Sequence, residues 1–195
     1  MSDLKEELHR KLQASRAALV SKLDGLSEYD RRRPMTPTGT NLLGLVKHLA
    51  GLEYGYLGES FGHPAPETMS WIEDGSIWQA ADMWAKPEES SEYIIGLYER
   101  ACAHADEVIA AHGLDAPGSV AHWPEDRRET TLGVLLVRMV AETAQHAGHA
   151  DIVRELIDGK GGPDQDSIDE PAWREYIAQV QAAADTFAID FSDQD

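Results

Sequence analysis

The sequence of 195 residues predicts an all-α protein built on a four-helix bundle. Four segments repeat apolar residues every three or four positions, which is the period of an amphipathic helix, and no segment shows convincing strand alternation. A connector of roughly 30 residues separates the second and third of these segments, whereas antiparallel helices need only short loops. We therefore expect a bundle in which the second and third helices run parallel.

The first two helices are predicted on either side of a proline-rich break. The first is expected from about Asp3 to Leu26, and DRRRPMTPTGT then interrupts it with two prolines and a glycine. Thr40 or Asn41 can cap a second helix that continues to about Ser60. Apolar residues spaced for one face define the two helices: Leu4, Leu8, Leu12, Leu19 and Leu23 in the first, and Leu42, Leu45, Leu49, Leu52 and Tyr56 in the second.

The second half of the chain predicts two further bundle helices and a short terminal one. Ser90 or Ser91 can cap the third helix, which ends before Gly113, and Thr130 or Thr131 can cap the fourth, which ends near Asp158. A shorter helix is expected over 171–186, followed by an acidic tail. We assign residues 1–160 to the bundle, and residues 161–195 to a short helix and tail packed on it or trailing from it.

The composition disfavours some classes of function. With 17 basic and 35 acidic residues the chain carries a formal charge of −18, which disfavours binding to nucleic acid or anionic lipid. The single Cys102 excludes an intramolecular disulfide and suits a reducing compartment. The charged N-terminus does not resemble a signal peptide, and no apolar run approaches the roughly 18 residues of a membrane span. We expect a cytoplasmic protein.

Residues 141–156, AETAQHAGHADIVREL, place ionisable side chains on an apolar stripe. Glu142, His146 and His149 lie on the same stripe as Met139 and Val153. A carboxylate on a core-facing stripe is costly unless something pairs with it. The partner could be Arg138, four residues earlier in an ordinary helix ion pair, or it could be a metal ion.

A third candidate ligand comes from the second helix. Glu142 and His146 are four residues apart, so both can reach one ion, and His48 lies between Leu45 and Leu52 on the apolar face. Three ligands leave coordination positions open, which is typical of catalytic zinc. A histidine on an apolar face is nevertheless more often a hydrogen-bonded core residue, so spacing alone leaves the question open.

The stretches TGTNLLGLVKHLAGLEYGYL and AETAQHAGHADIVREL resemble the DinB-like superfamily. They look most like its actinobacterial members close to the mycothiol-dependent maleylpyruvate isomerase group, over roughly residues 1–160. The resemblance implies an up-down-down-up bundle with a long crossover between helices two and three, and it implies that His48, Glu142 and His146 bind a metal. Many DinB-like proteins have histidine where Glu142 stands, but the isomerases have a His/Glu/His triad. Relatives also often form homodimers.

The resemblance further implies a metal-dependent transferase. A small thiol such as mycothiol would be activated as thiolate on a divalent metal and would attack a small-molecule substrate. Zinc is the metal expected from the ligand types, with nickel, manganese and iron as alternatives. Two rival functions stay open: a metal-dependent hydrolase using a metal-bound hydroxide, and a non-enzymatic metal-binding or structural bundle.

Further side chains are candidates for supporting the metal ligands or contacting substrate. They are His149, Glu53, Trp123 and Arg138. Glu53 could equally lie on the surface. The aromatic loops around Trp71, Trp84 and Trp123 could form a substrate pocket or could pack the end of the bundle.

Overall fold

The computed structural model describes residues 3–162 and 167–188. The chain divides into two compact units, Met1–Lys160 and Gly161–Asp195, and each is described by itself. The predicted acidic tail falls on residues 189–195, outside the described residues. Among the described residues, no helix combines the length and the apolar character that a bilayer crossing requires.

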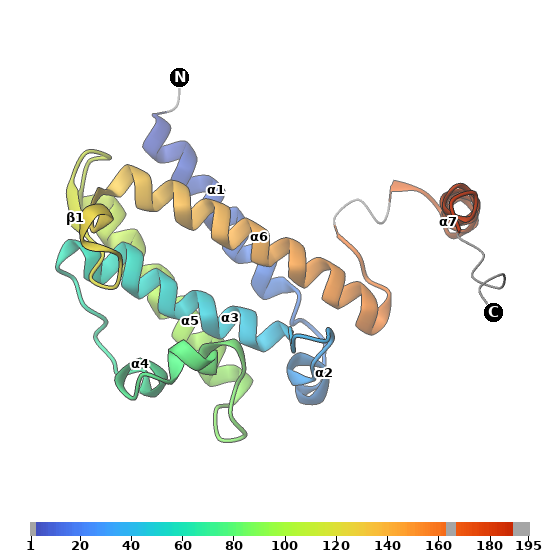
Figure 1. Cartoon of the computed structure of the whole chain (residues 1–195), viewed down its shortest axis with the longest axis horizontal. Coiled ribbons are helices and arrows are strands. Elements are labelled where there is room, and N and C mark those ends of the chain that lie inside the picture. Colours follow the sequence, from blue (N-terminus) through green and yellow to red (C-terminus); the bar gives the residue numbers. More distant parts are fainter. Residues whose placement is uncertain (1–2, 163–166, 189–195) are drawn as a thin grey trace, which may run out of the picture. The chain divides into compact units, whose positions relative to one another are not determined.

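The first unit is the predicted helical bundle (Figure 1). Its helices are α1 (Leu4–Ser21), α3 (Leu42–Leu52), α5 (Ser91–Ala111) and α6 (Leu132–Asp158). In Figure 1 α1 lies along α6, and α3 lies along α5. Helices α1 and α6 run parallel, since Leu12 shares a buried cluster with Leu135 and Lys22 forms an ion pair with Asp151 further along both helices.

The central pair runs in the opposite direction. Lys5, near the start of α1, donates to the carbonyl of His112 just beyond the end of α5, so α5 is antiparallel to α1. Lys47 binds Glu89 just before α5 begins, and Tyr54 stacks near His104 further along, so α3 and α5 are parallel. The expected up-down-down-up order, with its long crossover, is confirmed.

Helix boundaries follow local chemistry, with some departures from expectation. The Asn41 and Ser90 side chains accept hydrogen bonds from the backbone of Gly44 and Tyr93, and so cap α3 and α5 as predicted. The first helix ends at Ser21 instead of Leu26. The second helix is α-helical only to Leu52, and it continues as the π-helix η1 (Glu53–Gly58) and the 3₁₀ turn η2 (Glu59–Phe61).

A small hairpin, which the sequence did not reveal, precedes α6. Strands β1 (Pro117–Ser119) and β2 (Glu129–Thr131) pair antiparallel around the 3₁₀ turn η5 (Glu125–Arg127). Strands of three residues are too short to show a readable alternation. Between α1 and α3, the connection forms the short helix α2 (Glu28–Arg32).

The long crossover is fixed directly onto α3. It contains α4 (Ser70–Glu73), η3 (Ser76–Gln79) and η4 (Ala81–Met83). A Cβ at Gly44 would lie 1.8 Å from the Met83 carbonyl oxygen, so glycine is required for this close approach. The fully buried Lys47 ammonium donates to the carbonyls of Ala81 and Trp84 and to the Glu89 carboxylate. These contacts hold η4 against the first turns of α3.

The second unit contains α7 (Glu170–Asp185), close to the predicted terminal helix. Asp169 caps it by accepting a hydrogen bond from the Ala172 amide, and Pro171 lies in its first turn, where no amide hydrogen is needed. How this helix lies relative to the bundle stays a prediction.

Candidate metal centre

Helices α3 and α6 bring His48, Glu142 and His146 together. Each contributes one potential ligand atom, and these three atoms all lie within 4.8 Å of one another. Glu142 and His146 are one turn apart on α6, and His48 faces them from the antiparallel α3. The side chains are only partly buried, with exposed fractions of 18% for His48, 27% for Glu142 and 14% for His146. The cluster is therefore accessible from one side.

The three side chains are spaced as the ligands of one ion would be. Glu142 Oε1 is 3.8 Å from His48 Nε2 and 3.5 Å from His146 Nε2. These separations exceed a usual N–H···O hydrogen bond of about 2.9 Å. Two atoms that each bind a tetrahedral zinc ion at about 2.1 Å lie about 3.4 Å apart. Two imidazole nitrogens and one carboxylate oxygen thus fit a divalent metal in both spacing and chemistry.

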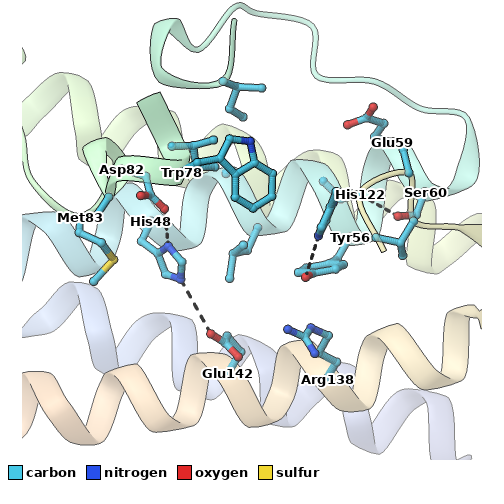
Figure 2. A pocket seen from close by; sticks show the side chains of 18 of the residues that line it. His48, Tyr56, Glu59, Ser60, Trp78, Asp82, Met83, His122, Arg138 and Glu142 are labelled. Atoms are coloured by element: carbon cyan, nitrogen blue, oxygen red, sulfur yellow. Dashed lines mark hydrogen bonds and ion pairs between the residues drawn. The ribbon is translucent and has the colours of Figure 1, made fainter. Parts of the chain in front are cut away.

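Asp82 fixes the orientation of His48. Its Oδ2 lies 2.6 Å from His48 Nδ1, as the dashed line in Figure 2 shows. With Nδ1 bound to a carboxylate, Nε2 is the nitrogen that faces Glu142. Metal-binding histidines usually have such an acceptor on the second ring nitrogen, which sets the tautomer and strengthens the ligand. Next to this turn, Ala80 adopts φ +61°, a left-handed conformation that non-glycine residues rarely adopt.

His146 is held in its neutral form. Burial is the largest influence that lowers its pKa, and the nearby His48 lowers it further. The two rings pack edge to face with centroids 5.1 Å apart. Because only neutral imidazole can bind a metal, a lowered pKa keeps His146 available as a ligand at neutral pH.

Beside this cluster lies a cavity of about 660 Å³, seen in Figure 2. His48, Asp82 and Glu142 line one part of it, and Arg138 lies one helical turn from Glu142. The apolar walls come mainly from the crossover, α3 and the hairpin: Leu52, Ile72, Ile77, Trp78, Met83 and Val120. The volume suits a small organic ligand.

Arg138, one of the two partners considered for Glu142, lies elsewhere in the cavity. Arg138 does not form an ion pair with Glu142; the Arg138 guanidinium instead lies 4.8 Å from the centre of the Tyr56 ring and 5.5 Å from that of Trp123. The Tyr56 hydroxyl is 3.3 Å from His122 Nε2. Burial and the charge of Arg138 both lower the pKa of His122.

The other candidates occupy different surroundings. Glu53 is fully buried and binds Arg16, and it does not line the cavity. His149 is exposed, with its ring 5.5 Å from that of His146. Trp123 packs on Tyr56. Trp71 is buried against the Lys47 ammonium, so it packs the crossover onto α3.

Sequence reasoning missed Asp82 and His122, which the structure places at the cavity, and it noted Trp78 only as part of the aromatic loops expected over one end of the bundle. Asp82 and Trp78 lie in the irregular crossover, where no periodicity marks which side chains turn inwards. His122 lies in the hairpin loop. Tyr56 was recognised only as part of an apolar face. The one available signal was the high aromatic content of the crossover.

The chain itself offers no activated thiol at this site. Cys102 lies on α5, outside the cavity lining, and burial raises the pKa of its thiol to about 12. A buried, protonated thiol is a poor nucleophile.

Comparisons with known proteins agree with the fold. The crystal structure of a conserved protein from Enterococcus faecalis is similar with a TM-score of 0.61 and 14% identity, covering 82% of this chain and 100% of that chain. At that identity the likeness concerns the fold. No curated protein matches the chain. The sequence model of the mycothiol-S-transferase family matches residues 7–159, and the chain therefore belongs to this family of DinB-like proteins.

Proposed function

We propose that the protein is a metal-dependent S-transferase that joins a small thiol, mycothiol or a related one, to an electrophilic substrate. The observation that carries the proposal is the position of His48, Glu142 and His146. Their ligand atoms face one another beside a cavity large enough for a small organic molecule. Membership of the mycothiol-S-transferase family supports the thiol as the nucleophile.

The residues of the ligand cluster have separate roles in the proposed transfer. His48 Nε2, one Glu142 oxygen and one His146 nitrogen would hold the ion, and Asp82 would keep the His48 ring in position. A divalent ion bound there supplies positive charge that lowers the pKa of a thiol beside it, so that the thiolate is available at neutral pH. In the overall transfer the thiol proton goes to solvent, a carbon–sulfur bond forms, and the leaving group departs with its bonding electrons.

The surroundings favour an external nucleophile. Cys102 lies outside the cavity and its pKa of about 12 keeps it protonated, so the sulfur must enter with a cofactor. Apolar side chains, among them Trp78 and Ile77, line the cavity beside the ligand cluster. These features favour attack by the sulfur of an external thiol over hydrolysis.

The first test is the metal content of untagged protein beside His48→Ala, Glu142→Ala and His146→Ala. We expect nearly one equivalent of metal in the parent, loss of that metal in each variant, and no loss in Glu155→Ala, which removes an exposed carboxylate from the same helix. A parent that holds no metal and cannot be loaded with zinc or nickel contradicts the proposal.

A second experiment distinguishes a thiol transferase from a hydrolase and from a non-enzymatic metal-binding bundle. Calorimetric titration with mycothiol should show saturable binding to the metal-loaded parent and none to Glu142→Ala. Ester hydrolysis that proceeds equally without any thiol would indicate a hydrolase instead. Metal binding without either activity would indicate a metal-binding bundle.

Three further expectations belong to this proposal. Zinc is the ion we propose, because two imidazoles and a carboxylate are ligands that it favours. A homodimer and a cytoplasmic location stay predictions, and light scattering coupled to gel filtration would test the first.

A further inference from the structure

The cavity contains a cationic side chain one turn away from the candidate metal ligands. Arg138 precedes Glu142 by four residues on α6, and both line the cavity (Figure 2). Four residues of α-helix correspond to about 6 Å along the axis. A small molecule in the cavity can therefore place one end at Arg138 and another part at the ligand cluster.

Arg138 stacks on aromatic rings and has no acidic partner in the described part of the chain. Its guanidinium lies over the faces of Tyr56 and Trp123. Stacking of this kind leaves the N–H groups at the edge of the guanidinium plane free to donate. Within residues 3–162 and 167–188, no ion pair joins Arg138 to a carboxylate, whereas Arg16 and Arg100 each bind one through two nitrogens.

Among the described residues, Arg127, Arg128 and Arg138 have no carboxylate partner, and of these three only Arg138 lines the cavity. Glu142 is within helical reach of Arg138 but faces the two histidines instead. Glu59 also lines the cavity and does not pair with Arg138. Within the described part of the chain no carboxylate compensates the charge of Arg138, which is exposed to solvent and borders a largely apolar space. Its guanidinium is therefore available to bind an anion there.

The charges around the cavity also limit the kind of anion. Asp82 and Glu142 together carry two negative charges, which offset a divalent ion in the ligand cluster. Arg138 then provides a single positive charge, and Glu59 adds a negative one to the same lining. The single charge of Arg138 matches that of a monoanion. The planar guanidinium edge also matches a carboxylate in two parallel hydrogen bonds.

We propose that Arg138 binds the carboxylate of the electrophilic substrate and so selects small carboxylic acids with an apolar body. The apolar body would lie against Trp78, Ile77 and Val120, and the reactive carbon would point toward the candidate metal ligands. This inference rests on the proposed function and names the class of its acceptor substrate.

The test compares two ligands that differ only in charge. Neither 3,5-dinitrobenzoate nor 3,5-dinitrobenzamide carries a leaving group, so both bind without transfer. By calorimetry we expect the acid to bind the parent at least tenfold more tightly than the amide. Arg138→Gln should remove this preference while changing amide binding less than twofold, and Arg138→Lys should keep part of it. Arg128→Gln, which changes an exposed arginine outside the cavity lining, is the matched control.

Several results would overturn the inference. They are equal binding of acid and amide to the parent, equal weakening of both by Arg138→Gln, and absence of saturable acid binding at millimolar concentration. Displacement of the acid by added mycothiol would also overturn it, because the thiol would then occupy the place assigned to the acceptor.

The same measurement on His48→Ala separates this inference from the proposed function. His48 does not contact Arg138, so part of the preference for the acid should persist in that variant, although loss of the metal leaves the charges of Asp82 and Glu142 uncompensated and weakens acid binding. If the parent prefers the acid but transfers no thiol, the proposed function fails alone. If the parent transfers thiol and shows no preference, the inference about Arg138 fails alone.

Discussion

The helical segment formed by α3 and η1 contributes to two clusters of ionisable side chains, and the clusters differ in how their charges are satisfied. Glu53 lies in a closed cluster: both of its oxygens accept hydrogen bonds from Arg16, at 2.8 and 2.6 Å. His48 lies in an open cluster, where Glu142 is 3.8 Å from His48 and 3.5 Å from His146. The two residues are only five positions apart along the chain.

Burial makes the difference physically meaningful. Glu53 is fully buried and Arg16 nearly so, which is tolerable only because the two form a bidentate ion pair. Burial disfavours the charge on Arg16, but its bonds to Glu53 outweigh this effect and raise the pKa of the guanidinium. Among the described residues, Glu142 has no arginine or lysine partner; it faces only the imidazoles of His48 and His146, and its side chain remains 27% exposed. The closed cluster thus holds helices together, whereas the open cluster is prepared for a cation from outside.

The largest effect is expected from breaking the closed cluster. Arg16→Met should lower the free energy of unfolding by about 3–5 kcal/mol, because it leaves the Glu53 carboxylate buried without a partner. Urea denaturation followed by circular dichroism would measure this change. The metal content of the folded protein should stay the same, since Arg16 lies outside the cavity lining.

A double variant provides the control. Arg16→Met combined with Glu53→Leu removes both charges, and we expect it to recover most of the lost stability. A loss below about 1 kcal/mol in the single variant would mean that the pair contributes no more than a surface ion pair. The distinction between a structural and a functional cluster would then fail.

A substitution in the open cluster should change the affinity for metal and leave the free energy of unfolding nearly unchanged. Asp82→Asn keeps the size of the side chain but removes the charge that orients His48, so we expect metal affinity to fall about tenfold. Tenfold corresponds to about 1.4 kcal/mol of binding free energy. Competition with a chromophoric zinc chelator would measure it, and the unfolding free energy of the metal-free protein should change little.

Glu59→Gln is the matched control, because Glu59 is another carboxylate of the cavity lining that has no contact with His48. Equal losses of affinity in the two variants would show that Asp82 acts only through its general negative charge. An unchanged affinity in Asp82→Asn would remove it from the site.

The bundle and the neighbouring positions of Glu142 and His146 were predictable from the sequence because they depend on local spacing, whereas spacing alone left the cluster with His48 open and the resemblance to DinB-like proteins implied it. Leucines on one face define α1 and α3, and a spacing of four places Glu142 and His146 on one side of α6. The long crossover indicated correctly that α3 and α5 run parallel. These features need only the helix period and the length of a loop.

The surroundings of the cluster were not predictable in the same way. Asp82 reaches His48 because Gly44 admits the Met83 carbonyl, a contact across about forty positions that has no periodic signal. Glu53 was a candidate beside the metal, yet Arg16 from α1 binds it. Which partner a side chain meets depends on how helices distant in sequence are packed.

The smallest expected effect is a pH-dependent change in the free energy of unfolding, and it comes from Asp106 at the edge of the closed cluster. Asp106 accepts a hydrogen bond from Arg16 at 2.6 Å and remains partly exposed. Burial opposes its ionisation, but the hydrogen bond and charge of Arg16, together with hydrogen bonds to His9 and Gln13, outweigh burial and lower the pKa of Asp106. A lowered carboxyl pKa stabilises the fold above the unfolded value of about 3.9, and this contribution disappears as the pH falls through the folded value.

Asp106→Asn should therefore cost about 1 kcal/mol at pH 7, and the difference from the parent should shrink as the pH is lowered below about 4. Urea denaturation of both proteins at pH 7, 5, 4 and 3 would measure the trend. A difference that does not change with pH would mean that Asp106 contributes through packing and not through its charge. In that case the charged part of the closed cluster would be the Arg16–Glu53 pair without Asp106.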